Sequence, residues 1–236
     1  MMKNYVGALG NFSYDDAAFA LKPHPLDQDR QILKYIGNED NGHNIQIPEG
    51  IKDCSYMFEG CFALRPAPVI PEGVQDITGM FKDCSGLLTT PDIPQSVTIL
   101  SRAFEGCIAL ENAKILPDKA VDVEGMFSGC RSLYNHPPIL TETVERAGFM
   151  FEGCASLMTP IYIKEGGNSI DCGKMYSGCE SLAYANQLPE RVSDFSGMYE
   201  GCSDKIQTAA EWMQEHRGEQ YEVLTAELAD YDYELE

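Results

Sequence analysis

A short pattern of apolar and polar residues returns seven times in the middle of the chain. Each copy has a methionine (once an alanine), a phenylalanine or tyrosine, two polar or small residues, and a cysteine. The copies occupy residues 57–61, 80–84, 103–107, 126–130, 150–154, 175–179 and 198–202, and successive cysteines lie 23 to 25 residues apart. Seven copies at a nearly fixed period predict an array of similar structural units.

Other apolar positions keep the same register. An isoleucine or leucine stands nine residues after the cysteine, often followed by proline, and an apolar residue stands ten before it. A leucine stands three residues after the cysteine at Leu64, Leu87, Leu110, Leu133, Leu157 and Leu182. One coil alone cannot bury these side chains, but stacked coils can, so the pattern predicts a solenoid that begins near Ile47.

The elements of one coil follow from its local sequence. The stretch 64–70 has apolar residues and prolines that favour a short extended segment pairing with neighbouring coils, and residues 71–73 favour a turn. A serine or threonine six residues before the cysteine could cap one helical turn carrying the Met-Phe pair. The glycine before the cysteine is expected to end that turn in a left-handed conformation, which Asp83 also tolerates.

The motif resembles the BspA-like leucine-rich repeats of bacteria and some protists, with their Phe-x-x-Cys-x-x-Leu core and following Ile-Pro. The resemblance covers residues 47–202. It implies an α/β repeat solenoid: a curved leucine-rich-repeat array of about seven coils, with short strands and single helical turns, used for binding. Many members of the family resemble secreted or wall-anchored adhesins, whereas this sequence shows neither a signal peptide nor a sorting tail.

The flanking segments are predicted to cover the two ends of the array, since a solenoid needs terminal covers with a polar outer face. Residues 1–46 are the expected N-terminal cap, with an apolar strip whose helical or extended form the periodicity leaves open. That strip consists of Ile32, Leu33, Tyr35 and Ile36. Residues 203–236 are the expected acidic, helical C-terminal cap, in which Ile206, Ala209, Ala210 and Met213 share one helical face.

The composition narrows the range of functions. The chain has 37 Asp and Glu against 17 Lys and Arg, a formal net charge of −20. This excess argues against direct contact with nucleic acid or with an anionic membrane, because both need clustered basic residues. No segment is long and apolar enough to span a bilayer, and no secretory signal is visible, so a cytoplasmic location is expected.

The nine cysteines fall into inward columns of the repeat. Seven form the repeated cysteine position, and Cys54 and Cys172 each lie seven residues before one of them, at a position that is otherwise apolar. Pairs at metal-ligand spacing such as Cys-x-x-Cys are absent from the sequence. We therefore expect free, buried thiols that behave as small hydrophobic residues, with no disulfide, metal or cofactor.

No catalytic motif is visible in the sequence. The four histidines, His24, His43, His136 and His216, are scattered, and there is neither a phosphate-binding glycine loop nor a Gly-x-Ser-x-Gly elbow. The sequence therefore predicts a protein that is not an enzyme.

Acidic residues also recur, at twelve, eight and two residues before the cysteine. The acidic surface predicted from the first two positions comprises Glu49, Glu72, Asp76, Asp118, Asp122, Glu142, Asp171, Glu190 and Asp194. One interpretation is a solvated outer surface that keeps the solenoid soluble. The other is a negative ribbon for a basic protein or for divalent cations, although no calcium-loop spacing supports the cations.

The extended segments offer a second candidate surface. If their side chains alternate, positions four, six and eight after each cysteine point outward. In the middle and later repeats the candidate partner-binding residues there are Leu88, Tyr134, His136, Met158 and Tyr162. Exposed aromatic residues on a rigid scaffold are typical of binding hot spots. The alternative is that some of them only cover the strand edge.

The sequence therefore predicts a non-enzymatic intracellular module that binds an unknown protein partner through the solenoid surface. One alternative is an acidic inhibitor that imitates nucleic acid and blocks a host nuclease or defence protein. Another is a cell-surface adhesin exported without a visible signal peptide. The sequence leaves the partner's identity and the oligomeric state open.

Overall fold

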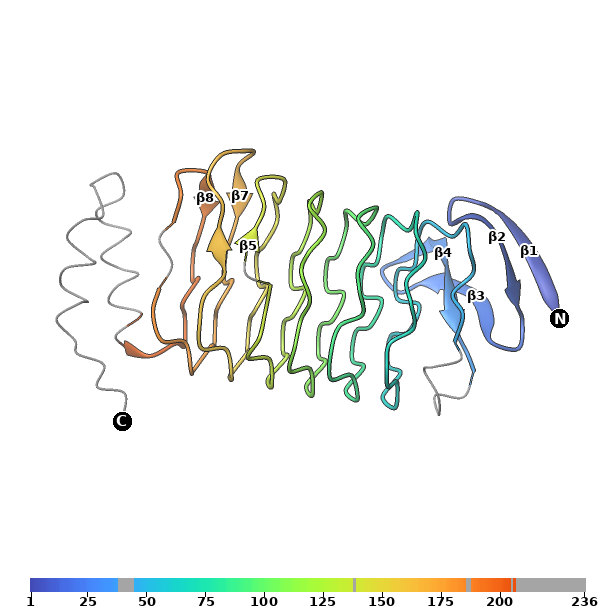
Figure 1. Ribbon diagram of the computed structural model, residues 1–236, viewed down its shortest axis with the longest axis horizontal. Coiled ribbons are helices and arrows are strands. Elements are labelled where there is room, and N and C mark those ends of the chain that lie inside the picture. Colours follow the sequence, from blue (N-terminus) through green and yellow to red (C-terminus); the bar gives the residue numbers. More distant parts are fainter. Residues whose placement is uncertain (38–44, 138, 186–187, 205, 207–236) are drawn as a thin grey trace.

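The coils of the repeat stack side by side along the long axis of the molecule (Figure 1). This computed structural model describes residues 1–37, 45–137, 139–185, 188–204 and 206. The predicted C-terminal cap, residues 203–236, lies almost entirely outside the described residues. The boundaries proposed for the two caps stay predictions.

The N-terminal segment forms two antiparallel hairpins, β1 (Met2–Gly7) with β2 (Gly10–Asp15), and β3 (Phe19–His24) with β4 (Asp27–Tyr35). The apolar strip left open by the periodicity is thus extended over most of its length, because it belongs to β4. Both hairpins are joined to the first coil, since the Lys52 N–H donates to the Leu9 carbonyl at 2.7 Å and the Tyr35 N–H to the Met57 carbonyl at 2.9 Å.

The segment that carries each Met-Phe pair is a chain of turns tied to the next coil. Alternate N–H groups donate to the following coil, as from Phe58 to Met80 at 2.9 Å. The intervening groups donate three residues back, as from Cys61 to Phe58 at 3.0 Å. The predicted helical turn is not confirmed here, because half of the donors that a helix would use internally bond to a neighbouring coil.

Two left-handed residues bend each of these segments. The glycine before the cysteine has φ between +69° and +77° in all six glycine copies, and Asp83 has φ +59°, which confirms the expected left-handed position. A second left-handed position lies five residues before the cysteine and was not predicted. Glycine fills it at Gly79, Gly125 and Gly197, and larger residues fill it at Tyr56, Arg102, Phe149 and Lys174.

Two parallel backbone ladders connect the coils. One runs through the predicted extended segments, by bridges Thr89↔Asn112 and Asn112↔Asn135 and by β5 (Ile139–Leu140) beside β6 (Tyr162–Ile163). The longer one runs eight residues before each cysteine, from Asp53↔Asp76 to Arg146↔Asp171, and continues in β7 (Ile170–Asp171) beside β8 (Val192–Asp194). From its residue types, this second position is predicted only to form an acidic surface.

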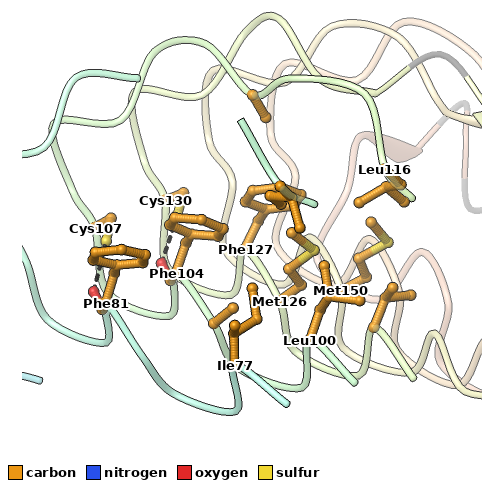
Figure 2. Close-up of a cluster of buried hydrophobic side chains, with 14 of the residues drawn as sticks. Ile77, Phe81, Leu100, Phe104, Cys107, Leu116, Met126, Phe127, Cys130 and Met150 are labelled. Atoms are coloured by element: carbon orange, nitrogen blue, oxygen red, sulfur yellow. Dashed lines mark hydrogen bonds between the residues drawn. The ribbon is translucent and has the colours of Figure 1, made fainter. Parts of the chain in front are cut away.

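A column of stacked rings fills the core. From Phe58 through Phe127 to Tyr199, the rings of neighbouring coils are nearly parallel, with centroids 5.4 to 5.7 Å apart. Figure 2 shows Phe81, Phe104 and Phe127 of this column. The β3–β4 hairpin extends the column, because the ring of Tyr35 lies 5.4 Å and that of Phe19 lies 6.4 Å from Phe58. The rings therefore form one continuous apolar column through successive coils.

All nine cysteines are free and buried, as the register predicted. In six repeats the thiol also donates to the carbonyl of the aromatic residue one coil back, as from Cys130 to Phe104 at 3.1 Å (Figure 2). Burial raises the pKa of Cys107 to about 12 and that of Cys130 well above the ordinary range. These thiols are consequently neutral donors inside the core.

Candidate functional site

Large apolar side chains are exposed on the face that carries the first ladder. Tyr134 is 53 % exposed, and in the next coil Met158 is 59 % and Tyr162 60 % exposed. Tyr184, in the next coil, is 52 % exposed. We call these four residues the tyrosine patch. Leu88 is also exposed, but Glu111 occupies the equivalent position in the coil between Leu88 and Tyr134.

The backbone beneath the patch is held by hydrogen bonds between coils. The Ala183 N–H donates to the Met158 carbonyl at 2.9 Å, and the Tyr134 N–H donates to the Glu111 carbonyl at 3.3 Å. Tyr162 lies in β6 opposite Ile139 of β5. The patch therefore sits on backbone whose conformation is fixed before any partner arrives.

The prediction that position six points outward was wrong. Thr90 and Ala113 occupy it and are buried, and His136 is only partly exposed. The His136 ring meets Phe151 of the core edge-on, with centroids 5.5 Å apart, and its Nε2 lies 3.2 Å from the Thr159 hydroxyl. Only isolated bridges pair the backbone here, so the strict alternation of a continuous strand does not hold.

Tyr184 was missed for the same reason. It stands five residues after its cysteine, where alternation would turn the side chain inward, yet Thr89, Asn135 and Thr159 at this position are exposed as well. The signal in the sequence was the polar character of this position, which holds threonine or asparagine in four repeats. These polar side chains form a row beside the patch, in which Asn135 Nδ2 donates to Asn112 Oδ1 at 3.2 Å.

The acids eight residues before the cysteine have a local structural role. Their carboxylates accept the N–H two residues later, as Asp122 does from Glu124 at 3.0 Å and Asp76 from Thr78 at 2.8 Å. Asp171 and Asp194 make the same contact, each at 2.8 Å, with Gly173 and Ser196. The N–H of Ser196 lowers the pKa of Asp194. This position therefore fixes turns, as aspartate side chains often do.

Basic residues neutralise several of the acids. Arg146 pairs with the buried Asp122, and Arg30 pairs with both Asp53 and Asp76. Two residues before the cysteine, Glu59 pairs with Lys34, Glu105 with Lys82 and Glu200 with Lys174. Both positions thus contribute less free negative charge than their composition indicates.

The acids twelve residues before the cysteine are the more exposed set. Glu49, Glu72, Asp118 and Glu190 are exposed, whereas Glu142 is partly buried and pairs with Lys164 at 2.8 Å. The hydrogen bond from Lys164 lowers the pKa of Glu142. The predicted acidic surface is therefore divided between an exposed row of carboxylates and a set used in turns and ion pairs.

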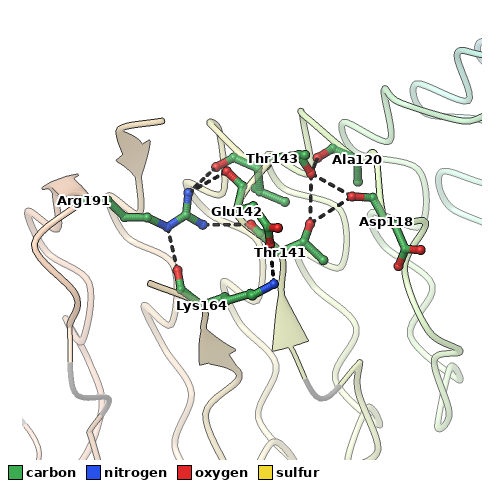
Figure 3. Close-up of polar contacts among 8 residues, drawn as sticks. Asp118, Ala120, Thr141, Glu142, Thr143, Lys164 and Arg191 are labelled. Atoms are coloured by element: carbon green, nitrogen blue, oxygen red, sulfur yellow. Dashed lines mark hydrogen bonds and ion pairs between the residues drawn. The ribbon is translucent and has the colours of Figure 1, made fainter. Parts of the chain in front are cut away.

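Arg191 organises the edge beside Glu142, a role that the sequence did not indicate (Figure 3). Its guanidinium donates to five backbone carbonyls from two neighbouring coils, at 2.8 to 3.2 Å. These carbonyls belong to Thr141, Glu142, Val144, Lys164 and Asn168. The repeat lengthens to 24 and 25 residues here, and Arg191 satisfies carbonyls of the longer connections.

Neither a metal-binding cluster nor a membrane-spanning helix is found in the part of the chain that the structure describes. No three His, Cys, Asp or Glu side chains come together there in a way that could hold a metal ion. Nor does any helix within these residues have the length and apolar character needed to cross a membrane.

Comparisons with known proteins agree with the repeat architecture. A family described as the BspA type Leucine rich repeat region matches residues 35–134 and 99–207 with six copies, well over half of the chain. The structure is similar to the leucine-rich repeat protein of T. pallidum, with a TM-score of 0.59 and 22 % identity over 85 % of this chain and 95 % of that one. This likeness supports the fold.

A leucine-rich repeat protein from Bacteroides ovatus ATCC 8483 also matches, with a TM-score of 0.48 and 23 % identity over 67 % of this chain and 46 % of that one. No curated protein matches the sequence.

Proposed function

Because the chain belongs to the BspA-type leucine-rich-repeat family, we propose that it is a binding scaffold of about seven coils that holds a protein partner on the tyrosine patch. Leucine-rich repeats of this family are typical of protein–protein interaction. In this proposal the protein works in the cytoplasm and catalyses no reaction. Its affinity comes from a preformed surface.

The observation that carries the proposal is the exposure of four large side chains from three consecutive coils above hydrogen-bonded backbone. Tyrosine and methionine are enriched at protein interfaces. Tyrosine also buries much area at a modest cost in conformational entropy. A fixed backbone reduces the ordering cost further. Tyr134, Met158 and Tyr162 would supply most of the binding energy, with Tyr184 completing the surface.

The acidic mimic of nucleic acid is the weaker candidate. Such a mimic needs free, regularly spaced carboxylates, whereas Asp76 and Asp122 are engaged in turns and ion pairs. Salt distinguishes the two functions, because charge-driven binding falls steeply with salt and apolar binding does not. Detection of the native protein outside the cell would instead favour the adhesin.

The test compares two triple variants of the full chain as baits in extracts of the native host. The patch variant carries Tyr134→Ala, Met158→Ala and Tyr162→Ala. The control variant carries Leu26→Ala, Val69→Ala and Ile108→Ala, three exposed apolar residues outside the patch. We expect the partner retained by the unmodified chain to be lost only with the patch variant, at low and at high salt. Melting temperatures of both variants verify that they are folded.

Two outcomes would contradict the proposal. One is capture that survives in the patch variant. The other is capture by the unmodified chain that disappears at high salt, which would favour the acidic surface as the binding site.

A further inference from the structure

β1 is the strand of the N-terminal hairpins in which no residue is buried. β1 and β2 form a sheet of two strands, and Figure 1 shows β1 outside β2 at one end of the molecule. An exposed strand edge is a ready template for another strand. The edge lies far along the chain from the tyrosine patch, so pairing at β1 is independent of the proposed function.

The register of the hairpin shows which backbone groups face outward. The Asp16 N–H donates to the Met1 carbonyl at 3.0 Å, one step beyond the Met2↔Asp15 pair. Hydrogen-bonded and non-bonded pairs alternate along an antiparallel ladder. Lys3, Tyr5 and Gly7 therefore bond to β2. The N–H and carbonyl groups of Met2, Asn4 and Val6 point away from β2.

The side chains of β1 divide between two faces of the hairpin. Tyr5 turns toward the molecule, where its ring stacks on Phe12 with centroids 5.0 Å apart. Met2, Asn4 and Val6 occupy the other face, on which Val6 is 81 % and Met2 65 % exposed. Two exposed apolar side chains thus flank a polar one on a strand whose outer edge is accessible.

We propose that this edge is a dimer interface, at which β1 of a second copy pairs antiparallel with β1 about a two-fold axis through Asn4. In this register Met2 lies opposite Val6 of the partner subunit, and Asn4 lies opposite the partner's Asn4. The three outward residues of each strand form three hydrogen-bonded pairs and hence six backbone hydrogen bonds. A shift by two residues in either direction leaves only two such pairs.

The side chains of β1 complement one another in the same register. Met2 and Val6 meet across the strands on one face, which buries the apolar surface that each copy exposes. Lys3 lies opposite Tyr5 of the partner subunit on the other face, where an ammonium group is attracted to an aromatic ring. A two-fold axis repeats both contacts. Self-complementarity of this kind is the property that a symmetric interface requires, and it selects a second copy over an unrelated strand.

Charge does not prevent this pairing. Within the hairpin, Asp16 Oδ2 forms an ion pair with Lys3 Nζ at 3.2 Å. The acidic columns belong to the coils, and salt at physiological strength screens exposed charges beyond about 8 Å. The interface is small compared with those of stable complexes, so the dimer is expected to dissociate on dilution. Two chains joined this way would present two tyrosine patches.

Sedimentation equilibrium of the full chain over a wide concentration range tests the dimer. The average mass should rise from 26.1 kDa toward twice that value as the concentration increases. Val6→Pro should keep the chain monomeric, because it removes an outward N–H without removing a bond to β2. Val6→Lys should do the same by placing a charge beside the partner's Met2. Val69→Lys is the matched control, since Val69 is 83 % exposed and lies in the coils.

A chain that stays monomeric at every concentration would overturn the proposal, and so would Val6→Lys protein that associates as strongly as the Val69→Lys control.

Cysteine cross-linking tests the register, because the native thiols are buried and only an introduced cysteine is accessible. Asn4→Cys should give a covalent dimer with oxidised glutathione, since opposite residues of a hydrogen-bonded pair lie about 5.5 Å apart, within disulfide range. Met2→Cys should cross-link only when mixed with Val6→Cys. Efficient cross-linking of Met2→Cys alone would contradict the two-fold axis at Asn4.

Discussion

The inward and outward positions of the same coils differ in how their residues vary. The cysteine position keeps one residue type in all seven repeats, and the ring position keeps phenylalanine or tyrosine. The exposed position four residues after the cysteine holds six different residues: Arg65, Leu88, Glu111, Tyr134, Met158 and Ala183. An inward side chain packs between equivalent residues of two neighbouring coils, so its replacement disturbs two contacts. An outward side chain has no such constraint, and it is there that a binding surface can differ from coil to coil.

The largest loss of stability is expected when an inward residue of the column of stacked rings is replaced. Phe104 is fully buried, and its ring is stacked between Phe81 and Phe127. Phe104→Ala should lower the free energy of unfolding by about 3 to 5 kcal/mol, because it removes a large side chain and leaves a cavity between two rings. Urea titration followed by circular dichroism measures the change. A loss below about 1 kcal/mol would show that the coils do not depend on a continuous column.

The buried thiols predict a stability that falls in alkaline solution. Burial holds the pKa of Cys130 well above its ordinary value, while in the unfolded chain it is about 8.5. The unfolded state therefore loses its proton first as the pH rises. Below pH 8 the thiol is neutral in both states and the stability contribution is complete; above pH 9 it declines with increasing pH.

Cys130→Ala isolates the contribution of one thiol to this dependence. At neutral pH the substitution should cost about 1 to 3 kcal/mol, because the Phe104 carbonyl loses its thiol donor. Between pH 9 and pH 10 the free energy of unfolding should decline less steeply than in the unmodified chain, by about 1.4 kcal/mol per pH unit. Urea midpoints across the pH series provide the measurement. Equal slopes in the two proteins would mean that Cys130 ionises in the folded state.

A smaller difference in stability is expected between two of the left-handed glycines that precede the cysteine. A Cβ at Gly153 would meet only ordinary contacts, 3.9 Å from Gly129, whereas one at Gly106 would clash with Asp83 Oδ1. Gly153→Ala should cost about 1 to 2 kcal/mol for its left-handed backbone alone. Gly106→Ala should cost more, and adding Asp83→Gly should bring it back to the Gly153→Ala value. Thermal unfolding of the three variants measures this, and equal costs for the two single substitutions would argue against the clash.

The inward columns were largely predictable from the sequence, because burial between identical neighbours leaves a repeated residue type. This holds for the free thiols and for the left-handed glycines at Gly60 and Gly129. The donation from thiol to carbonyl was not predictable, since a buried cysteine also fits as a small hydrophobic residue. The turns at Ser55 and Thr78 were missed because aspartate two residues earlier accepts their N–H groups, and the sequence shows the acid without its partner.

The outward face was predictable only in part. Exposure of Tyr134, Met158 and Tyr162 agrees with the alternation that was assumed. The assumption failed at His136 and Tyr184, because position six is buried or partly buried in these coils whereas position five is mostly exposed. Local backbone geometry on a short, irregular ladder depends on hydrogen bonds between coils. A periodic pattern in one coil does not record them.

The smallest change in stability is expected at an outward tyrosine. Comparing it with an inward tyrosine keeps the residue type constant and varies only the environment. Tyr134 and Tyr176 are both tyrosines of the array, but Tyr134 is exposed, whereas Tyr176 is fully buried with its ring 5.6 Å from Phe151 and its oxygen accepting the Ile161 N–H at 3.0 Å. Tyr134→Ala should change the free energy of unfolding by no more than about 0.5 kcal/mol, while Tyr176→Ala should cost several kcal/mol. Paired urea titrations measure both. If Tyr134→Ala were as costly as Tyr176→Ala, the exposed ring would be stabilising the coils. The tyrosine patch would then have a structural role and would no longer support binding of a partner.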